Sequence, residues 1–167
     1  MHHFATMTAA GMMAAAAVGM VVSASAQVAV EAKGKVMKGF VGGIEKLTEK
    51  NSDYRRVLYT GKHLQLVLMS IRPGDEIGEE VHGDGDQFFR IEEGKGEVWI
   101  DGNRSEVKGG DAILVPAGAR HNVKNTGQEP LRLYTLYAPP EHRDGTVHVT
   151  KADAQAANVH FDGKTTE

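Results

Sequence analysis

Short apolar runs alternate with polar turn residues along the middle of the chain. Each run is four to eight residues long, and glycine, proline, asparagine or aspartate stands between most of them. Runs of this length and spacing predict β-strands, and a long series of them predicts an all-β sandwich or barrel. The expected strands cover residues 57–60, 64–71, 87–91, 97–100, 104–107, 112–115, 121–124 and 131–137.

One of these turns has the residues of a tight hairpin. Asp101, Gly102 and Asn103 lie between the apolar runs at 97–100 and 104–107. Aspartate and glycine tolerate the positive φ angles that a two-residue hairpin turn requires. The sequence therefore predicts that these two strands form a hairpin.

Residues 1–26 have the pattern of a secretory signal peptide. A mildly apolar run over residues 11–22 leads to small residues at 24 and 26, which predict cleavage after Ala26. The run is shorter than the ~20 residues that a membrane-spanning helix needs, so no membrane span is expected in the mature chain. We therefore expect a periplasmic or secreted protein. Because no Lys or Arg precedes the run, a disordered alanine-rich tail and a misassigned start codon remain alternatives.

An arm is expected to lead from this segment into the domain. Residues 27–53 are polar and interrupted by glycines, with one helical turn expected around residues 44–49. The domain itself is expected to cover residues 54–140, because Pro139 and Pro140 end the sheet.

The C-terminal tail, residues 141–167, is expected to be mostly irregular. Thr150 and Asp153 have the spacing of a capping box, which predicts a short helix over residues 151–158. Three histidines of the tail are interpreted as solvated loop side chains and not as metal ligands: His142, His148 and His160.

The composition narrows the classes of partner and ligand. With 167 residues, a net charge of −3 and a pI near 6.2, the chain suits one domain and has no basic patch for nucleic acid. The absence of cysteine excludes disulfides and thiolate ligands, so any metal must be held by nitrogen and oxygen. A small-molecule ligand is the expected partner, and a homodimer is left open.

The residues from Gly110 to Asn125 have a spacing that carries chemistry. Gly110, Pro116, Gly118, His121 and Asn125 form the pattern G-x5-P-x-G-x2-H-x3-N. The proline and the second glycine make a turn after a short strand, and His121 begins the next strand. A histidine placed by a fixed turn is held rigidly, as a metal ligand must be.

This pattern is similar to the second conserved motif of the cupin family. The first motif of that family is G-x5-H-x-H, then three or four residues, a glutamate, six residues and a glycine. The corresponding positions here are Gly74, Glu80, His82, Gln87 and Gly94. The resemblance covers roughly residues 55–140. It implies a small single-domain cupin, which is a double-stranded β-helix, or jelly-roll barrel, with a short N-terminal arm and a C-terminal tail.

The resemblance also implies a metal site made of Glu80, His82, Gln87 and His121. Glu80 stands where cupins usually have histidine, and Gln87 stands where they usually have glutamate. The set resembles a rearranged phosphomannose isomerase site, another cupin, in which Gln-x-His, Glu and His bind the metal. Two imidazoles, one carboxylate and one amide oxygen suit a single divalent ion, and Fe, Mn, Zn and Ni are all compatible.

Strand alternation predicts which side chains point into the barrel. Residues two apart on a strand share a face, so the ligand positions 80 and 82 are expected to point inward together. Gln87 and Phe89 are likewise expected to point inward, with Phe88 and Arg90 outward.

Two alternatives remain open for this site. The changed ligands could mark a cupin that has lost its metal. Glu79, Asp84 and Asp86 could instead hold calcium in an acidic loop, although no EF-hand spacing is present.

Three functions are compatible with these residues. The leading hypothesis is a metal-dependent enzyme, an isomerase or a dioxygenase, that acts on a small oxygen-rich molecule. The second is a binding protein that holds a sugar or a small acid without turnover. The third is a sugar-phosphate isomerase, which the lack of a clustered Lys/Arg clamp disfavours.

Overall fold

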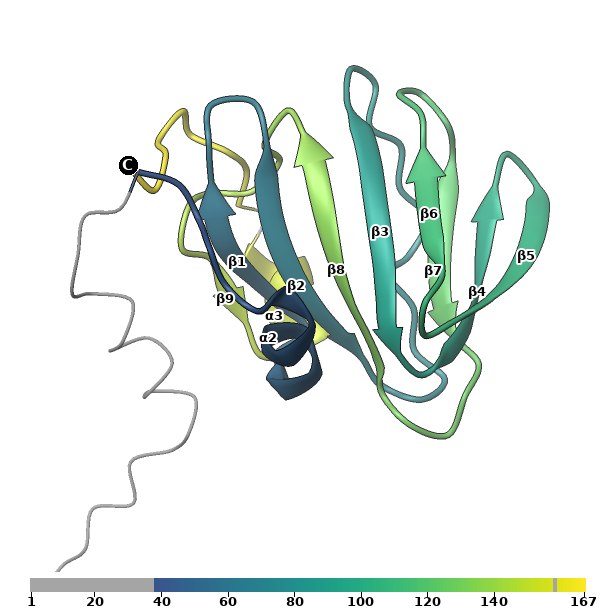
Figure 1. The fold of residues 1–167 in the computed structure, drawn as a ribbon. Coiled ribbons are helices and arrows are strands. Elements are labelled where there is room, and N and C mark those ends of the chain that lie inside the picture. The colour runs from purple at the N-terminus through teal and green to yellow at the C-terminus, as the bar shows by residue number, and fades with distance from the viewer. Residues whose placement is uncertain (1–37, 158) are drawn as a thin grey trace, which may run out of the picture. The chain divides into compact units, whose positions relative to one another are not determined.

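Two antiparallel sheets form the fold in the computed structural model, which describes residues 38–157 and 159–167 (Figure 1). The strands are β1 (Arg55–Thr60), β2 (Gln65–Ile71), β3 (Asp86–Glu93), β4 (Lys95–Ile100), β5 (Asn103–Lys108), β6 (Ala112–Val115), β7 (His121–Asn125), β8 (Leu131–Ala138) and β9 (Val147–His148). The larger sheet has the order β6-β3-β8-β2-β1-β9, and the smaller sheet has the order β5-β4-β7. The predicted all-β barrel is therefore confirmed, with the eight expected strands present and β9 added to them.

The segment before β3 extends the smaller sheet beyond β7. Isolated bridges join Glu76 to Lys124 and Glu80 to His121. The backbone N–H of Glu80 donates to the carbonyl of His121 at 2.9 Å, and the N–H of His121 donates back to the carbonyl of Glu80 at 3.0 Å. This pairing fixes residue 80 directly beside the start of β7.

Alternating side chains of the strands form one core between the sheets. On β3, Gln87, Phe89 and Ile91 are buried, whereas Phe88 and Arg90 are partly exposed, as predicted. Buried side chains of the neighbouring strands belong to the same core cluster as Phe89, among them Met69 and Leu133. Burial of such apolar side chains is the main term that stabilises a domain of this size.

Glycine is required at two of the connections that set the register. The β4–β5 hairpin has Ile100 opposite Asn103, and its two turn residues have φ angles of 47° at Asp101 and 81° at Gly102. This confirms the predicted hairpin. Gly94, between β3 and β4, has a φ angle of 93°, and a Cβ atom there would lie 2.7 Å from the carbonyl oxygen of Pro130. Any larger residue at position 94 would meet both backbone strain and a steric clash.

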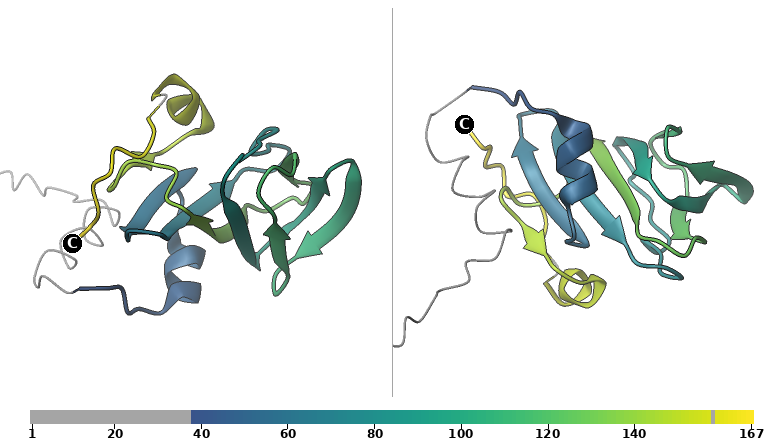
Figure 2. Two further views of the ribbon diagram at one scale, coloured as in Figure 1. Left: turned by 90° about the horizontal axis from the view of Figure 1, so that it is seen from above. Right: turned by 60° about the horizontal axis from the view of Figure 1, so that its bottom comes forward.

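Two short helices flank the larger sheet on opposite faces (Figure 2). Helix α2 (Ile44–Lys50) and helix α3 (Lys151–Ala157) lie where helical structure was expected. The N–H of Thr150 donates to Oδ2 of Asp153 at 2.8 Å, and the N–H of Asp153 donates to Oγ1 of Thr150 at 3.2 Å, which forms the predicted capping box. Residue 158, the last of the expected helix, lies outside the described residues.

The proposed signal peptide, residues 1–26, also lies outside the described residues, as do residues 27–37 of the arm expected at 27–53. Within the described part of the chain, no helix is both long enough and apolar enough to cross a membrane.

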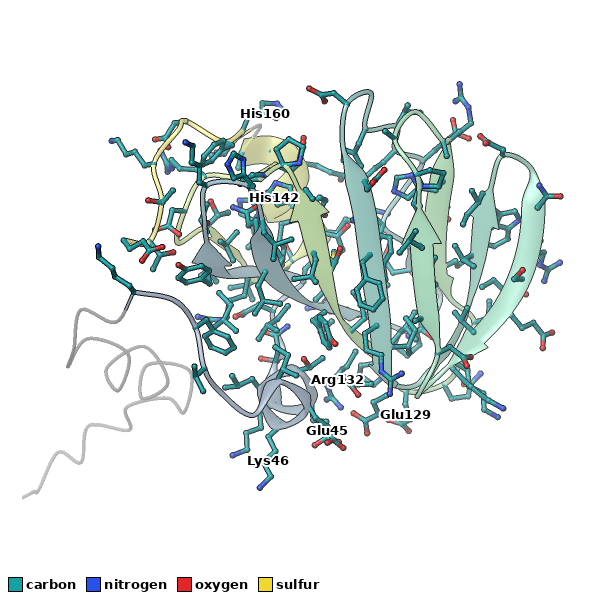
Figure 3. The ribbon with its side chains drawn as sticks, turned by 45° about the horizontal axis from the view of Figure 1, so that its top comes forward. Glu45, Lys46, Glu129, Arg132, His142 and His160 are labelled. Atoms are coloured by element: carbon teal, nitrogen blue, oxygen red, sulfur yellow. The ribbon has the colours of Figure 1, made fainter. Side chains whose placement is uncertain are left out.

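The C-terminal tail is more ordered than the sequence indicated, and two of its histidines are buried. Strand β9 pairs with β1, and the N–H of Thr166 donates to the carbonyl of Thr60 at 2.9 Å. His142 and His148 are only 8% and 9% exposed, so the interpretation of these two as solvated side chains was wrong. Figure 3 shows His142 and His160 at the same end of the molecule, away from Arg132 at the start of β8. Of these two histidines, His160 is exposed.

The cause is a contact between residues far apart in the sequence. The buried Gln65 side chain accepts a hydrogen bond from the N–H of His142 at 2.9 Å and donates one to its carbonyl at 2.6 Å. His148 lies opposite Arg55 in the β9–β1 pair. The tail is thereby held against the larger sheet instead of extending into solvent.

Candidate metal centre

The four predicted ligand residues come together at one end of the barrel. His121 begins β7 directly after the turn at Gly118, whose φ angle is 81°. The bridge between Glu80 and His121 brings the Glu80–His82 segment to the same place. Gln87 lies near the start of β3, opposite Val115 of β6 and Tyr137 of β8. Turns and strand pairing therefore position every member of the set.

Donor atoms of three of these residues converge. One ligand atom each from Glu80, His82 and His121 lies within 4.8 Å of the other two. Nε2 of His82 is 3.6 Å from Oε2 of Glu80, which is an ion-pair distance and too long for a hydrogen bond. Oε1 of Gln87 lies 2.9 Å from Nε2 of His121 and completes the group. We call Glu80, His82, Gln87 and His121 the donor cluster.

Neighbouring groups orient two of the donors toward each other. Nδ1 of His121 lies 3.1 Å from the carbonyl oxygen of Ala119, which assigns the proton to Nδ1 and leaves the lone pair on Nε2. Nε2 of Gln87 donates to Oγ1 of Thr135 at 3.1 Å, which turns Oε1 toward His121. Two hydrogen-bond acceptors thus face each other, and a cation that both could bind would remove this conflict.

Two further donor atoms are buried without a hydrogen bond. Oε2 of Glu80 and Nε2 of His82 have no hydrogen-bond partner among the described residues. An unsatisfied buried polar atom costs about 1–3 kcal/mol, so such atoms are rare unless a ligand or ion satisfies them. Nitrogen and oxygen donors with this burial fit a divalent cation, which Glu80, His82, Gln87 and His121 would hold.

The electrostatics of the cluster also favour a positive charge. The Glu80 carboxylate beside His82 raises the pKa of that imidazole, although desolvation acts in the opposite direction. Without a metal, the cluster therefore holds a proton near Glu80 up to a higher pH than an isolated histidine would. A metal ion would take the place of that proton, because a ligating imidazole must be neutral.

Two residues of the acidic loop that could hold calcium form contacts outside the donor cluster. Glu79 forms an exposed ion pair with Arg120, and Oδ1 of Asp86 accepts a hydrogen bond from the N–H of Ala117 at 2.9 Å. Among the described residues, Glu80, His82 and His121 are the convergent His/Asp/Glu group, and Asp84 and Asp86 do not take part.

Comparison with known proteins agrees with this architecture. The family model described as a cupin domain (Cupin_2) matches residues 67–137. The Bacillus subtilis (strain 168) protein YrkC is 50% identical over 126 residues, which are 72% of this chain and 68% of that protein. The crystal structure of BH2720 from Bacillus halodurans superimposes with a TM-score of 0.71 at 52% identity, covering 72% of this chain and 96% of that one. The chain belongs to the cupin family. The polyketide synthase CurC of Streptomyces cyaneus is 30% identical over 93 residues, 55% of this chain and 60% of that protein.

Several residues beside the donor cluster of this cupin were not singled out from the sequence. Arg55 lies with an Nη atom 3.9 Å from Oε1 of Glu80, and Glu141 lies with Oε2 3.7 Å from Nδ1 of His82. The ring of Tyr137 packs edge-on against His82, with centroids 5.6 Å apart. Strand alternation on β8 could have indicated that Thr135 and Tyr137 point inward. No local pattern marks Arg55 or Glu141.

The buried state of His142 predicts a stability effect in acid. Burial, together with the smaller effect of the nearby Arg55, lowers the pKa of His142 to about 3. The unfolded chain therefore binds more protons than the folded one between about pH 6.5 and pH 3, and the free energy of unfolding falls as the pH drops through that range. His142→Asn is expected to lose less stability than wild type over this window, by on the order of a few kcal/mol.

The measurement is urea denaturation of chelator-treated protein at several pH values. His63→Asn, which removes an exposed histidine, serves as the control and should follow wild type. Equal pH dependence of wild type and His142→Asn would show that His142 is charged in the folded state.

Proposed function

We propose that this cupin binds one divalent metal ion through Glu80, His82, Gln87 and His121 and acts as an enzyme on a small oxygen-rich molecule. The reaction would be of the isomerase or dioxygenase type. The observation that carries the proposal is the convergence of three His and Glu ligand atoms within 4.8 Å, with the Gln87 oxygen 2.9 Å from Nε2 of His121. Fe, Mn, Zn and Ni are the candidate ions.

A bound ion would supply Lewis acidity toward oxygen atoms of the substrate. Neighbouring residues hold the donor atoms of the cluster in position. The Ala119 carbonyl fixes the tautomer of His121, and Thr135 fixes the rotation of the Gln87 amide. The rings of Phe89 and Tyr137 lie against His121 and His82, with centroids 6.1 and 5.6 Å apart, and exclude water from one side of the cluster.

The balance of charge supports retained Lewis acidity. Glu80 is the one anionic member of the donor cluster, so a divalent ion would keep a residual charge of about +1. The similarity to CurC, whose name describes a polyketide synthase, favours an enzyme over a protein that only binds its ligand. A sugar-phosphate isomerase is less well supported, because among the described residues Arg55 is the only Lys or Arg that lines the cavity beside the cluster.

The test begins with metal analysis of protein purified without added metal. About one equivalent of a divalent metal per chain is expected, and Glu79→Gln, which removes an exposed carboxylate beside the cluster, should retain it. Product formation and oxygen consumption on a panel of small diketones, sugars and phenols then separate an enzyme from a binding protein. A wild-type protein that binds none of Fe, Mn, Zn or Ni would refute the proposal.

A further inference from the structure

A cavity of about 250 Å³ opens beside the donor cluster, against the C-terminal tail. Only two members of the cluster, Glu80 and His82, line it. The other walls come from β1 and from the tail and include Arg55, Glu141, His142 and His148. None of these four residues belongs to the two sequence motifs, so this cavity is specific to the way this chain folds its tail back.

Three residues that line the cavity each have a buried nitrogen atom with no hydrogen-bond partner among the described residues. These atoms are Nε of Arg55, Nε2 of His142 and Nδ1 of His148. Their positions are fixed by other contacts. Gln65 binds the backbone of His142, whose ring packs edge-on against Tyr137 with centroids 5.0 Å apart. His148 is held by the pairing of β9 with β1, directly opposite Arg55.

Nitrogen atoms held in this way suit an acceptor-rich ligand. A guanidinium presents several N–H groups in a fixed fork that matches the two oxygens of a carboxylate. A neutral imidazole adds one donor and one acceptor. Burial keeps His142 neutral, because it lowers the pKa of that imidazole to about 3. The wall can therefore donate to an anion and still accept from a hydroxyl group.

The charges around the cavity indicate how many negative charges the ligand carries. Counting only its arginine and carboxylate side chains, the cavity has one cation, Arg55, against the two carboxylates of Glu80 and Glu141. A divalent ion in the donor cluster reverses this balance to a net charge of about +1. A monoanion neutralises that charge, whereas a phosphate dianion would exceed it.

The volume limits the size of the ligand. At ~30 Å³ for each water molecule in the liquid, 250 Å³ corresponds to roughly eight waters. The buried part of a ligand is therefore a small acid and not a multi-ring compound.

We propose that this cavity is the substrate pocket and takes a small monocarboxylate with a hydroxyl or keto oxygen on the adjacent carbon. The carboxylate lies toward Arg55, His142 and His148, and the second oxygen lies toward the donor cluster. The inference rests on the proposed function, because the second oxygen needs the metal.

The test is calorimetric titration of the zinc-loaded full chain with L-lactate and pyruvate. Propionate, which lacks the second oxygen, and lactamide, which lacks the charge, are the matched comparators. Lactate is expected to bind at least about tenfold more tightly than either, because each comparator loses one of the two contacts. Arg55→Lys, which keeps the charge and loses the fork, should weaken lactate binding roughly tenfold to a hundredfold without changing the zinc content.

Arg104→Lys is the control variant. Arg104 lies on β5, the edge strand of the smaller sheet that is far from β9 (Figure 1), and forms an ion pair with Glu97. A titration of wild-type protein with the same ligands is followed by NMR through the ring signals of His142 and His148. This measurement does not depend on how any variant folds. Both sets of signals are expected to shift as lactate binds.

Zinc-loaded wild type that binds lactate no better than propionate and lactamide would overturn this inference and leave the proposed function standing. Lactate binding that leaves both histidine signals unchanged would also overturn it, because the ligand would then lie elsewhere. Wild type that binds no metal would refute the proposed function, and this inference with it.

Discussion

The double variant His82→Ala/His121→Ala is expected to lose roughly four orders of magnitude or more in metal affinity. These histidines supply both nitrogen donors of the cluster. Loss of a residue that only orients a ligand already costs 10–100-fold, so loss of a ligand itself should cost at least about a hundredfold each. Competition with a chelating dye measures the affinity, and metal analysis after dialysis measures the content.

The control for this variant removes two histidines that are not members of the cluster. His63 and His160 are both exposed, and His63→Ala/His160→Ala should bind metal as wild type does. Because His121 is only 2% exposed, its truncation also leaves a cavity, so circular dichroism must show that the double variant is folded. A folded double variant that still holds one metal would place the site elsewhere, with Asp84 and Asp86 the first residues to test.

The strands were predictable because their limits are set by local residues. The turn at Asp101 and Gly102 adopts the positive φ angles that these residue types favour, and β6 ends at the residue before Pro116. Inward and outward positions follow from the period of a strand, which is why the burial of Gln87 and Phe89 was predicted correctly.

The donor cluster was predictable for a similar reason. Each motif is a short segment in which a turn fixes a ligand position, and the barrel then brings the two segments together. The local spacing of the motifs did not indicate which groups orient the donors. The Thr135 hydroxyl beside Gln87 comes from a strand 48 residues further along the chain.

The cavity wall could not be predicted, because it depends on contacts between distant segments. Gln65 binds the backbone of His142 across 77 residues, and Arg55 meets β9 through sheet pairing. A histidine two residues after a Pro-Pro pair is normally solvated, and only the returning tail makes His142 buried. The inferred ligand therefore rests on the structure and not on the motifs.

Exchange of the carboxylate and the amide within the cluster tests why this cupin departs from the usual ligand order. Glu80→Gln should weaken metal binding by roughly a hundredfold or more, because it removes the one anionic ligand and leaves Arg55 without its ion-pair partner at 3.9 Å. Glu80→Gln/Gln87→Glu places a carboxylate where cupins usually have glutamate. In the wild-type protein the Thr135 hydroxyl lies 3.1 Å from the amide nitrogen of Gln87. In the double variant this hydroxyl can donate a hydrogen bond to the new carboxylate.

The double exchange is expected to recover the metal affinity to within about tenfold of wild type, since total ligand charge is restored. Lactate binding should not recover with it, because the negative donor has moved to the opposite side of the cluster, which changes where the second oxygen of lactate can bind. Metal affinity from dye competition and lactate affinity from calorimetry, measured on the four proteins of the cycle, separate the two effects. If Gln87→Glu fails to rescue metal binding in a folded Glu80→Gln protein, the position of the carboxylate, and not its charge alone, determines whether the cluster binds metal.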